Sequence, residues 1–261
     1  MKTVFNKRSM EYEVPKIMGI LNVTPDSFSD GGLHTNPVKH AFSMIDDGVD
    51  VIDIGGESTR PGFSQVSEEQ EIERIIPVIK ELSGSSSIPI SADTMKPKVA
   101  RAAIDAGADI INMVNFTDEM LKVVANSNAA IIIMHTPADI SGVHNNVMKG
   151  NAIEQIKNFL ISRTKAAIEA GIEKDRIITD PGIGFGKTEE QNYEILKNSG
   201  TFSNGLPVLI GASRKRFLSY AYPNMSKEDA SVLAAVDAIR NGASIVRVHD
   251  VKRTKEAFKA I

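Results

Sequence analysis

Residues 177–188 read IITDPGIGFGKT, an apolar, β-branched run that ends in an aspartate and a glycine-rich segment. The first half is typical of a buried parallel strand. The closing Gly-Lys-Thr resembles a nucleotide-binding phosphate loop, which also needs a glycine five positions before its last glycine. Here that position is Pro181, which has no backbone N–H to donate to a phosphate. The segment therefore indicates a strand and a loop of another kind, with Lys187 and Thr188 beginning the next helix.

The same pattern of a strand followed by a polar loop recurs along the chain. The apolar runs are residues 17–23, 49–56, 89–94, 109–114, 129–135, 177–182, 207–213 and 244–250. Between them lie segments with helical periodicity, such as EEQEIERIIPVIKEL at 68–82. Eight such repeats predict a (β/α)8 TIM barrel, which typically takes about 250 residues. A doubly wound α/β sheet is the alternative, but no GxGxxG motif follows the first strand.

The segment before residue 16 precedes the first repeat. We expect it to form a short N-terminal extension, a β-hairpin that closes the floor of the barrel. No linker or change of composition divides the remaining chain. Residues 1–261 are therefore predicted to form a single barrel domain.

The composition is typical of a globular enzyme that binds small molecules. A net charge of -3 and a pI near 6.0 give no basic surface of the kind that binds nucleic acid. No stretch has the apolar length of a membrane span or of a signal-peptide core, so we expect a cytoplasmic protein without a membrane partner. The chain has no cysteine, which excludes thiolate metal sites and cysteine nucleophiles.

Polar residues stand at the end of each predicted strand. They are Asn22, the loop after Gly55 and Gly56, Asp93, Asn112, His135, Asp180, the Ser213-Arg214-Lys215 segment, Arg247 and His249. Active sites of (β/α)8 barrels lie where the strands end, because the loops to the helices converge there. A single aspartate after a strand often only caps a helix, and Asp93 could cap the helix that begins near Lys96. Eight polar strand ends together predict an active site.

Seven stretches resemble the motifs of the dihydropteroate synthase family. They are GILNVTPDSFSDGG (19–32), DIGGESTRPG (53–62), ISADT (90–94), ARAAIDAGADIIN (100–112), DPGIGFGKT (180–188), GASRK (211–215) and VRVHDV (246–251). The resemblance implies a pterin-binding barrel that joins a dihydropterin pyrophosphate to 4-aminobenzoate in folate biosynthesis. It also implies Mg2+ as cofactor, a homodimer, inhibition by sulfonamides, and an SN1-like loss of pyrophosphate before the amine attacks.

The resemblance assigns the pterin ring to the strand ends. Asp180 would accept from the ring N–H and the exocyclic amine, a two-pronged contact that suits a carboxylate. Asn112 and Lys215 would contact the remaining polar edge, and Met134 and Phe185 would pack against the ring. Asp93 would also contact the pterin.

Other residues would act on the reacting groups. Asp93, with Asp30 beside it, would stabilise positive charge on the methylene as pyrophosphate leaves. The leaving pyrophosphate would contact Arg247, His249 and Asn22, and the side-chain oxygen of Asn22 would bind Mg2+.

The aminobenzoate site would form from the two loops that the motifs at 19–32 and 53–62 contain. Phe28 and Pro61 would sandwich the benzene ring, while Thr59, Arg60 and Asp30 tie the loops together; Arg60 and Lys215 complete the catalytic set with the two aspartates. The carboxylate would lie at the N-terminus of the helix expected after Ser213, where free N–H groups favour anions.

The chain departs from the family pattern at two places. Many members follow the strand-four Asn with Asp, whereas Met113 follows Asn112 here, and the usual MHMxGTP is shortened to MHTP at 134–137. Both changes affect one wall of the pocket.

Two alternatives remain open at this stage. One is a methyltetrahydrofolate/corrinoid methyltransferase, which shares the pterin-facing Asp and Asn, and the other is a non-catalytic pterin-binding barrel. The intact segments at 22–32 and 55–62 disfavour the first, and Asp93, Arg60 and Lys215 disfavour the second.

Overall fold

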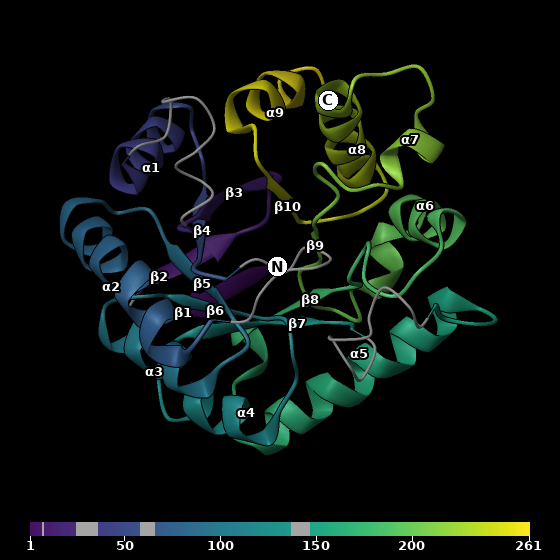
Figure 1. Cartoon of the computed structure of the whole chain (residues 1–261). Helices are drawn as coiled ribbons and strands as arrows, with labels where there is room; N and C mark the ends of the chain where they lie inside the picture. The colour runs from purple at the N-terminus through teal and green to yellow at the C-terminus, as the bar shows by residue number, and fades with distance from the viewer. Residues whose placement is uncertain (7, 25–35, 58–65, 137–146) are drawn as a thin grey trace.

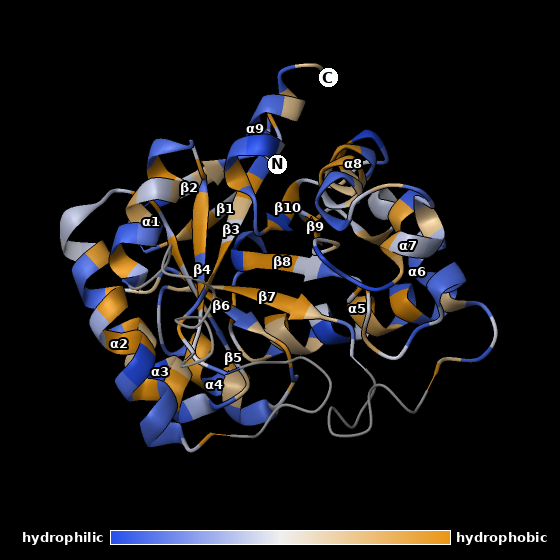
Figure 2. Ribbon diagram, turned by 45° about the horizontal axis from the view of Figure 1, so that its top comes forward, coloured by the Kyte–Doolittle hydropathy of each residue, from blue (hydrophilic) through white to orange (hydrophobic). Residues whose placement is uncertain are grey.

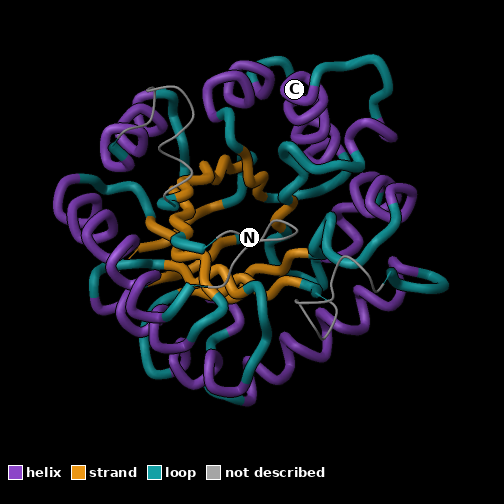
Figure 3. The backbone as a smooth tube through the Cα atoms, viewed as in Figure 1, coloured by secondary structure: helices purple, strands orange, loops and turns teal. Residues whose placement is uncertain are grey.

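The computed structural model describes residues 1–6, 8–24, 36–57, 66–136 and 147–261. Within them, eight parallel strands stand in a ring surrounded by helices (Figures 1 and 3). The strands are β3 (Lys16–Asn22), β4 (Val51–Gly55), β5 (Ile90–Thr94), β6 (Ile110–Met113), β7 (Ala130–Met134), β8 (Ile177–Asp180), β9 (Leu209–Ile210) and β10 (Ile245–Val248). A parallel bridge between Thr179 and Val208 joins the two edges of the sheet, so the ring closes. The predicted (β/α)8 barrel is confirmed.

The helices of the described residues cover the outside of the ring. They are α1 (Pro37–Asp46), α2 (Glu68–Ser85), α3 (Pro97–Asp105), α4 (Asp118–Ala125), α5 (Ala152–Glu169), α6 (Glu189–Lys197), α7 (Leu218–Ala221), α8 (Lys227–Arg240) and α9 (Val251–Phe258), with 3-10 turns η2 (Lys174–Arg176) and η3 (Ser199–Phe202). Their apolar sides face the strands and their polar sides face outward (Figure 2). None of the helices in the described ranges is both long and apolar enough to cross a membrane.

Capping residues fix where the helices start. Ser67 and Thr188 each form a capping box. The hydroxyl accepts from the backbone N–H of the third helical residue, a glutamine, and the side-chain oxygen of that glutamine accepts from the backbone N–H of the capping residue. Thr188 was expected to begin α6 together with Lys187; it caps the helix from the position immediately before it, and Lys187 lies one residue further from the helix.

The N-terminal extension is the expected hairpin. β1 (Lys2–Phe5) and β2 (Arg8–Glu11) pair antiparallel. Phe5 and Met10 pack into an apolar cluster with inward residues of the barrel strands, including Met18 and Ile245. The hairpin thus closes the amino-terminal end of the barrel, and the apolar filling leaves only the carboxyl end open for a site.

Asp109 attaches this hairpin to the barrel. Its buried carboxylate accepts from both Arg8 and Asn6 of the hairpin region, at 2.8 to 3.1 Å. The same carboxylate accepts from the backbone N–H of Ile90 at the start of β5. One side chain therefore connects the floor hairpin to two neighbouring strands.

We expect Asp109→Ala to lower stability by ~3 kcal/mol, because it leaves an N–H and a guanidinium without their acceptor. For a domain of this size the melting temperature should fall by roughly 6–12 °C, measured by thermal unfolding. The control is Asp105→Ala, since Asp105 is exposed at the end of α3. Equal melting temperatures for the two variants would contradict the attachment. If Arg8→Met is added to Asp109→Ala, the further loss should be small, because the pair no longer exists.

Candidate active site

The barrel interior changes from apolar to polar within two residues. The floor cluster includes one inward residue from each of four strands: Val51, Ile110, Ile178 and Ile245. Because side chains alternate between the faces of a strand, the residues two positions further along also point inward. Those residues are Asp53, Asn112, Asp180 and Arg247. A polar layer therefore follows the apolar one at the carboxyl ends of the strands.

Arg247 holds two carboxylates at the centre of this layer. Its Nε donates to Asp53 Oδ2 and its Nη2 donates to Asp93 Oδ2, and the donor–acceptor distance is 2.5 Å in each bond. Asn112 Nδ2 donates to the same Asp53 oxygen at a distance of 3.2 Å. Burial raises the pKa of Asp93, and the positive charge of Arg247 partly offsets that rise. The guanidinium therefore holds the two carboxylates close together.

Asp53 is a site residue that the motif analysis left without a role. It is fully buried, and its Oδ1 has no hydrogen-bond partner among the described residues. Its position in the apolar run VDVIDIGG could have revealed it, because a charged residue on the inward face of a buried strand needs a partner. Asp93, by contrast, does not cap α3, whose N-cap is Lys96.

Asp180 and Lys215 form a second polar group beside the first. Asp180 Oδ1 accepts from the N–H of Gly182 at 2.7 Å. Lys215 donates to the carbonyl of Ile183, and its Nζ lies 4.8 Å from the centre of the Phe185 ring. Burial raises the pKa of Asp180, whereas burial lowers the pKa of Lys215 to about 8 despite the opposing effect of Asp180.

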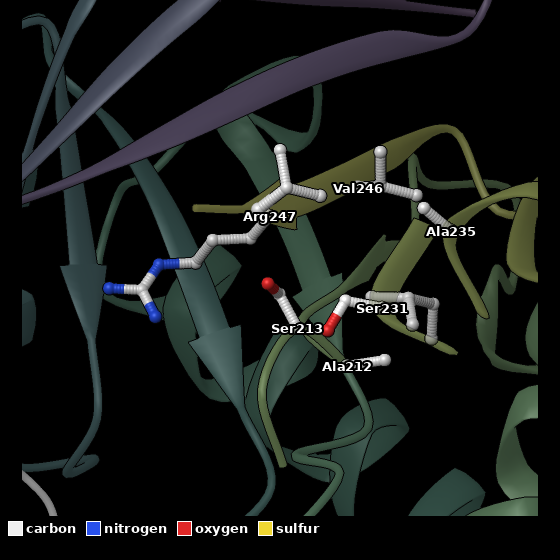
Figure 4. Close-up of a pocket in the computed structure, with 8 residues that line it drawn as sticks. Ala212, Ser213, Ser231, Ala235, Val246 and Arg247 are labelled. Atoms are coloured by element: carbon white, nitrogen blue, oxygen red, sulfur yellow. The ribbon is translucent and has the colours of Figure 1, made fainter. Parts of the chain in front are cut away.

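The two groups lie close enough to affect each other's charge. Arg247 and Asp93 both influence the protonation of Lys215, and Arg247 also influences that of Asp180. Figure 4 shows Arg247 extending away from Ser231 and Ala235, which line a small hollow between β9, β10 and α8. The structure therefore brings Asp93, Asn112, Asp180, Lys215 and Arg247 together at one mouth of the barrel.

Asn22 lies at the rim of this mouth. It is the exposed last residue of β3 and pairs in register with Gly55 of β4. A Cβ at Gly55 would lie 3.9 Å from Asn22 Oδ1 and 3.6 Å from the Cβ of Asp93, so these two side chains flank the glycine. On the other side, Met134 ends β7 and pairs in register with Asp180.

Ser213 and His249 form a pair on the loops after β9 and β10. The Ser213 hydroxyl lies 3.0 Å from His249 Nδ1 and accepts from the His249 backbone N–H at 3.3 Å. The prediction of a helix directly after Ser213 is wrong. A turn follows instead, with Arg214 in the left-handed region at φ 60°, and the short α7 begins only at Leu218. The Arg214 N–H donates to Ser231 of α8 and the Lys215 N–H donates to the carbonyl of Ala212, so the helix N-terminus proposed for a carboxylate is not formed there.

Five predicted site residues lie outside the described residues. They are Phe28, Asp30, Thr59, Arg60 and Pro61. Glu57 and Val66, which flank residues 58–65, are described. Glu57 Oε1 accepts from the N–H of Val66, and Glu57 Oε2 accepts from Lys96 at 2.6 Å.

His135 follows β7 and lies buried beside Lys187. Its Nδ1 is 3.0 Å from Lys187 Nζ, and its ring packs edge-on against Phe159 with centroids 4.8 Å apart. Burial, reinforced by the charge of Lys187, lowers the pKa of His135 from 6.5 to about 3. The imidazole is therefore neutral in the folded protein at neutral pH.

This neutral histidine should make the protein less stable in acid. Below about pH 6.5 the unfolded chain binds a proton on the imidazole, while the folded chain does so only near the lowered pKa of about 3. Unfolding then takes up a proton, so stability falls by about 1 kcal/mol between pH 6.5 and 5.5 and approaches about 1.4 kcal/mol for each further pH unit. Urea unfolding at pH 6.5 and 5.5 should show this contribution in the unmodified protein and lack it in His135→Gln. The same pH dependence in both proteins would exclude a neutral buried His135.

Comparisons with known proteins agree over almost the whole chain. A family model described as pterin binding enzyme matches residues 18–249. The dihydropteroate synthase of Clostridium beijerinckii is 44% identical over 253 residues, which cover 93% of this chain and 91% of that protein.

Two solved structures from Xanthomonas albilineans are similar in three dimensions. Its dihydropteroate synthase with 4-aminobenzoic acid superposes with a TM-score of 0.91 at 38% identity, covering 100% of this chain and 97% of that one. The complex of this enzyme with 7,8-dihydropteroate gives a TM-score of 0.87 with the same identity and coverage. Fold, sequence and polar layer thus agree, and the resemblance read from the seven motifs is confirmed: the chain belongs to the dihydropteroate synthase family of pterin-binding enzymes.

Proposed function

We propose that this barrel condenses 6-hydroxymethyl-7,8-dihydropterin pyrophosphate with 4-aminobenzoate, giving 7,8-dihydropteroate and pyrophosphate. The observation that carries the proposal is the buried Asp180–Lys215 group beside the Arg247-bridged acids at the carboxyl end of the barrel. The X. albilineans relatives, solved with 4-aminobenzoic acid and with 7,8-dihydropteroate, support the two ends of the reaction.

The pterin is held by groups that the fold has already desolvated. Asp180 Oδ1 accepts from the Gly182 N–H and still has a second lone pair, so both carboxylate oxygens can accept from the ring N–H and the exocyclic amine. Lys215 would donate to the ring carbonyl, and Asn112 to a ring nitrogen. Met134 and Phe185 supply apolar contact on either side. A ring that lacked these polar groups would leave buried partners unsatisfied, which gives the site its specificity.

The reaction itself needs stabilisation of charge rather than a nucleophile. When pyrophosphate leaves, positive charge develops on the exocyclic methylene, and we assign its stabilisation to Asp93, with Asp30 as a second acid. Arg247 holds Asp93 in place and offers its remaining terminal nitrogen to the leaving group, with His249 beside it. The arylamine is neutral at pH 7, so its attack on the methylene needs no strong base.

The second substrate would be bound by Phe28, Thr59, Arg60 and Pro61, with Ser213 at the edge. An aromatic ring and a proline can sandwich a benzene ring, and an arginine can pair with its carboxylate. Ser213 brings a hydroxyl already paired with His249, close to where the pyrophosphate would leave.

Mg2+ fits the donors at the rim. Among the described residues no cluster of three or more His, Cys, Asp or Glu side chains could hold a metal. Mg2+ often takes only one or two protein oxygens together with substrate phosphates, so the exposed amide oxygen of Asn22 suffices as the protein ligand. When bound, the ion would neutralise the leaving pyrophosphate.

The test is direct turnover. The purified protein is incubated with the pterin pyrophosphate, 4-aminobenzoate and Mg2+, and dihydropteroate and pyrophosphate are measured by chromatography. Both products are expected in equal amounts. A methyltransferase or a non-catalytic binder would give neither, and that result would reject the proposal.

Removal of the metal should slow this reaction sharply. With excess EDTA we expect turnover to fall by at least ~10-fold, because pyrophosphate is a poor leaving group when its charge is not neutralised. Activity should return when Mg2+ is added in excess over the chelator. Undiminished turnover in EDTA would remove Mg2+ from the mechanism.

A homodimer and a cytoplasmic location stay predictions of the sequence. Sedimentation velocity of the purified protein would test the homodimer.

A further inference from the structure

Lys187 is a buried cation that the proposed reaction does not use. It belongs to the Gly-Lys-Thr segment after β8, and it is only 7% exposed. Its Nζ donates to the carbonyls of Gly182 at 2.7 Å and Phe185 at 2.9 Å, and it lies 3.0 Å from His135 Nδ1. A protonated lysine amine has three donors, so these three acceptors use all of them. Burial lowers the pKa of Lys187 to about 7, with Asp180 opposing the change.

The loop that Lys187 contacts needs external support. Residues 181–186 contain three glycines in the left-handed region, Gly182, Gly184 and Gly186, with φ between 60° and 87°. Glycine adopts this conformation without strain but also leaves it readily, since it has no side chain to restrict the backbone. A Cβ at Gly182 would lie 2.0 Å from the His135 carbonyl oxygen, so the loop passes directly against the end of β7.

Contacts of this loop lead directly to the pterin site. The Gly182 N–H donates to Asp180, while the Gly182 carbonyl accepts from Lys187. The next carbonyl, that of Ile183, accepts from Lys215. Loss of the Lys187 contacts would therefore loosen the peptide groups that orient both Asp180 and Lys215, although Asn192 still accepts from the Gly184 N–H.

We propose that Lys187 is a positioning residue, which holds the 181–186 loop in the shape that aims Asp180 and Lys215 at the pterin ring. The inference rests on the proposed function of that site. It differs from the phosphate role that Gly-Lys-Thr suggests, because every donor of the amine is already directed at the protein. Lys187 acts through its neighbours and contacts no substrate.

The experiment compares two ligands on matched variants. Isothermal calorimetry gives the Kd for 6-hydroxymethyl-7,8-dihydropterin and for its pyrophosphate ester, with the intact protein, Lys187→Met and Lys187→Gln. Lys187→Met keeps the length of the side chain but removes all donors, and Lys187→Gln retains two. Lys197→Met is the control, because Lys197 is exposed on α6.

A positioning role predicts that Lys187→Met raises both Kd values equally, by ~10-fold or more, since two or more hydrogen bonds that shape the site are lost. Lys187→Gln should fall between Lys187→Met and the intact protein, and the KM for 4-aminobenzoate should change little. A rise for the ester alone would overturn the proposal in favour of phosphate binding.

Unchanged Kd values with a lowered melting temperature would show a purely structural residue and also overturn it. If Lys187→Met does not fold, the Kd values of Lys187→Gln decide the question. Failure of the intact protein to bind either pterin would instead reject the proposed function.

Discussion

Asp180→Ala is expected to abolish pterin binding, raising the Kd by ~100-fold or more. The carboxylate would make two charge-assisted hydrogen bonds to the pterin, each contributing roughly 1.5–3 kcal/mol. The variant also leaves the buried Lys215 without the carboxylate that favours its charged form. Calorimetric titration with 6-hydroxymethyl-7,8-dihydropterin measures the effect.

Two further variants separate this effect from general damage. Asp175→Ala changes an exposed aspartate just before the same strand and should bind pterin normally. Arg60→Ala should also keep pterin affinity but lose turnover with 4-aminobenzoate. If Arg60→Ala and Asp180→Ala lost pterin affinity equally, the proposed division between the two substrate sites would be wrong.

Arg247→Met is expected to remove both activity and a large part of the stability. It leaves Asp53 and Asp93 as two buried acids without their shared cation, and breaking a buried ion pair from one side typically costs about 3–5 kcal/mol. The melting temperature should fall by about 6–20 °C. Thermal unfolding and the turnover assay measure the two effects.

The reason for the loss can be checked on the same residues. Adding Asp53→Asn to Arg247→Met should restore part of the stability, because one uncompensated charge disappears, but should not restore turnover. Arg253→Met provides the comparison, since Arg253 pairs with Asp229 at an exposed surface, where such pairs contribute about 0–1 kcal/mol. Equal melting temperatures for Arg247→Met and Arg253→Met would show that the buried network does not stabilise the barrel.

Much of the candidate site follows from local pattern. Asn112 and Asp180 stand at the ends of β-branched apolar runs, and the period of two in a strand makes them point the same way as the floor residues two positions before them. The same rule, applied to the run at 49–56, also predicts an inward Asp53. Its motif, DIGGESTRPG, gives this aspartate no role in the family, but a buried charge on an inward face needs a partner, and Arg247 is that partner.

Local pattern gave wrong predictions where a residue bonds to a partner that is distant in the sequence. The sequence suggested that Lys187 begins a helix, but its amine turns inward to the carbonyls of the preceding loop and to His135, 52 residues earlier. The expected helix after Ser213 likewise gives way to a turn, whose Arg214 N–H donates to Ser231 of α8. In both cases one hydrogen-bond partner is distant in the sequence, so local pattern does not contain it.

The sequence by itself determined the alternation of strands and helices and the polar character of the strand ends, because periodicity acts over a few residues. Only the closed barrel decided which polar ends meet. Arg247 reaches Asp53 across 194 residues and Asp93 across 154, because closure places β10 beside β3 and brings the ends of β4 and β5 within reach. The charge state of the site is equally a tertiary property, since burial at that mouth lowers the pKa of Lys215 and raises that of Asp180.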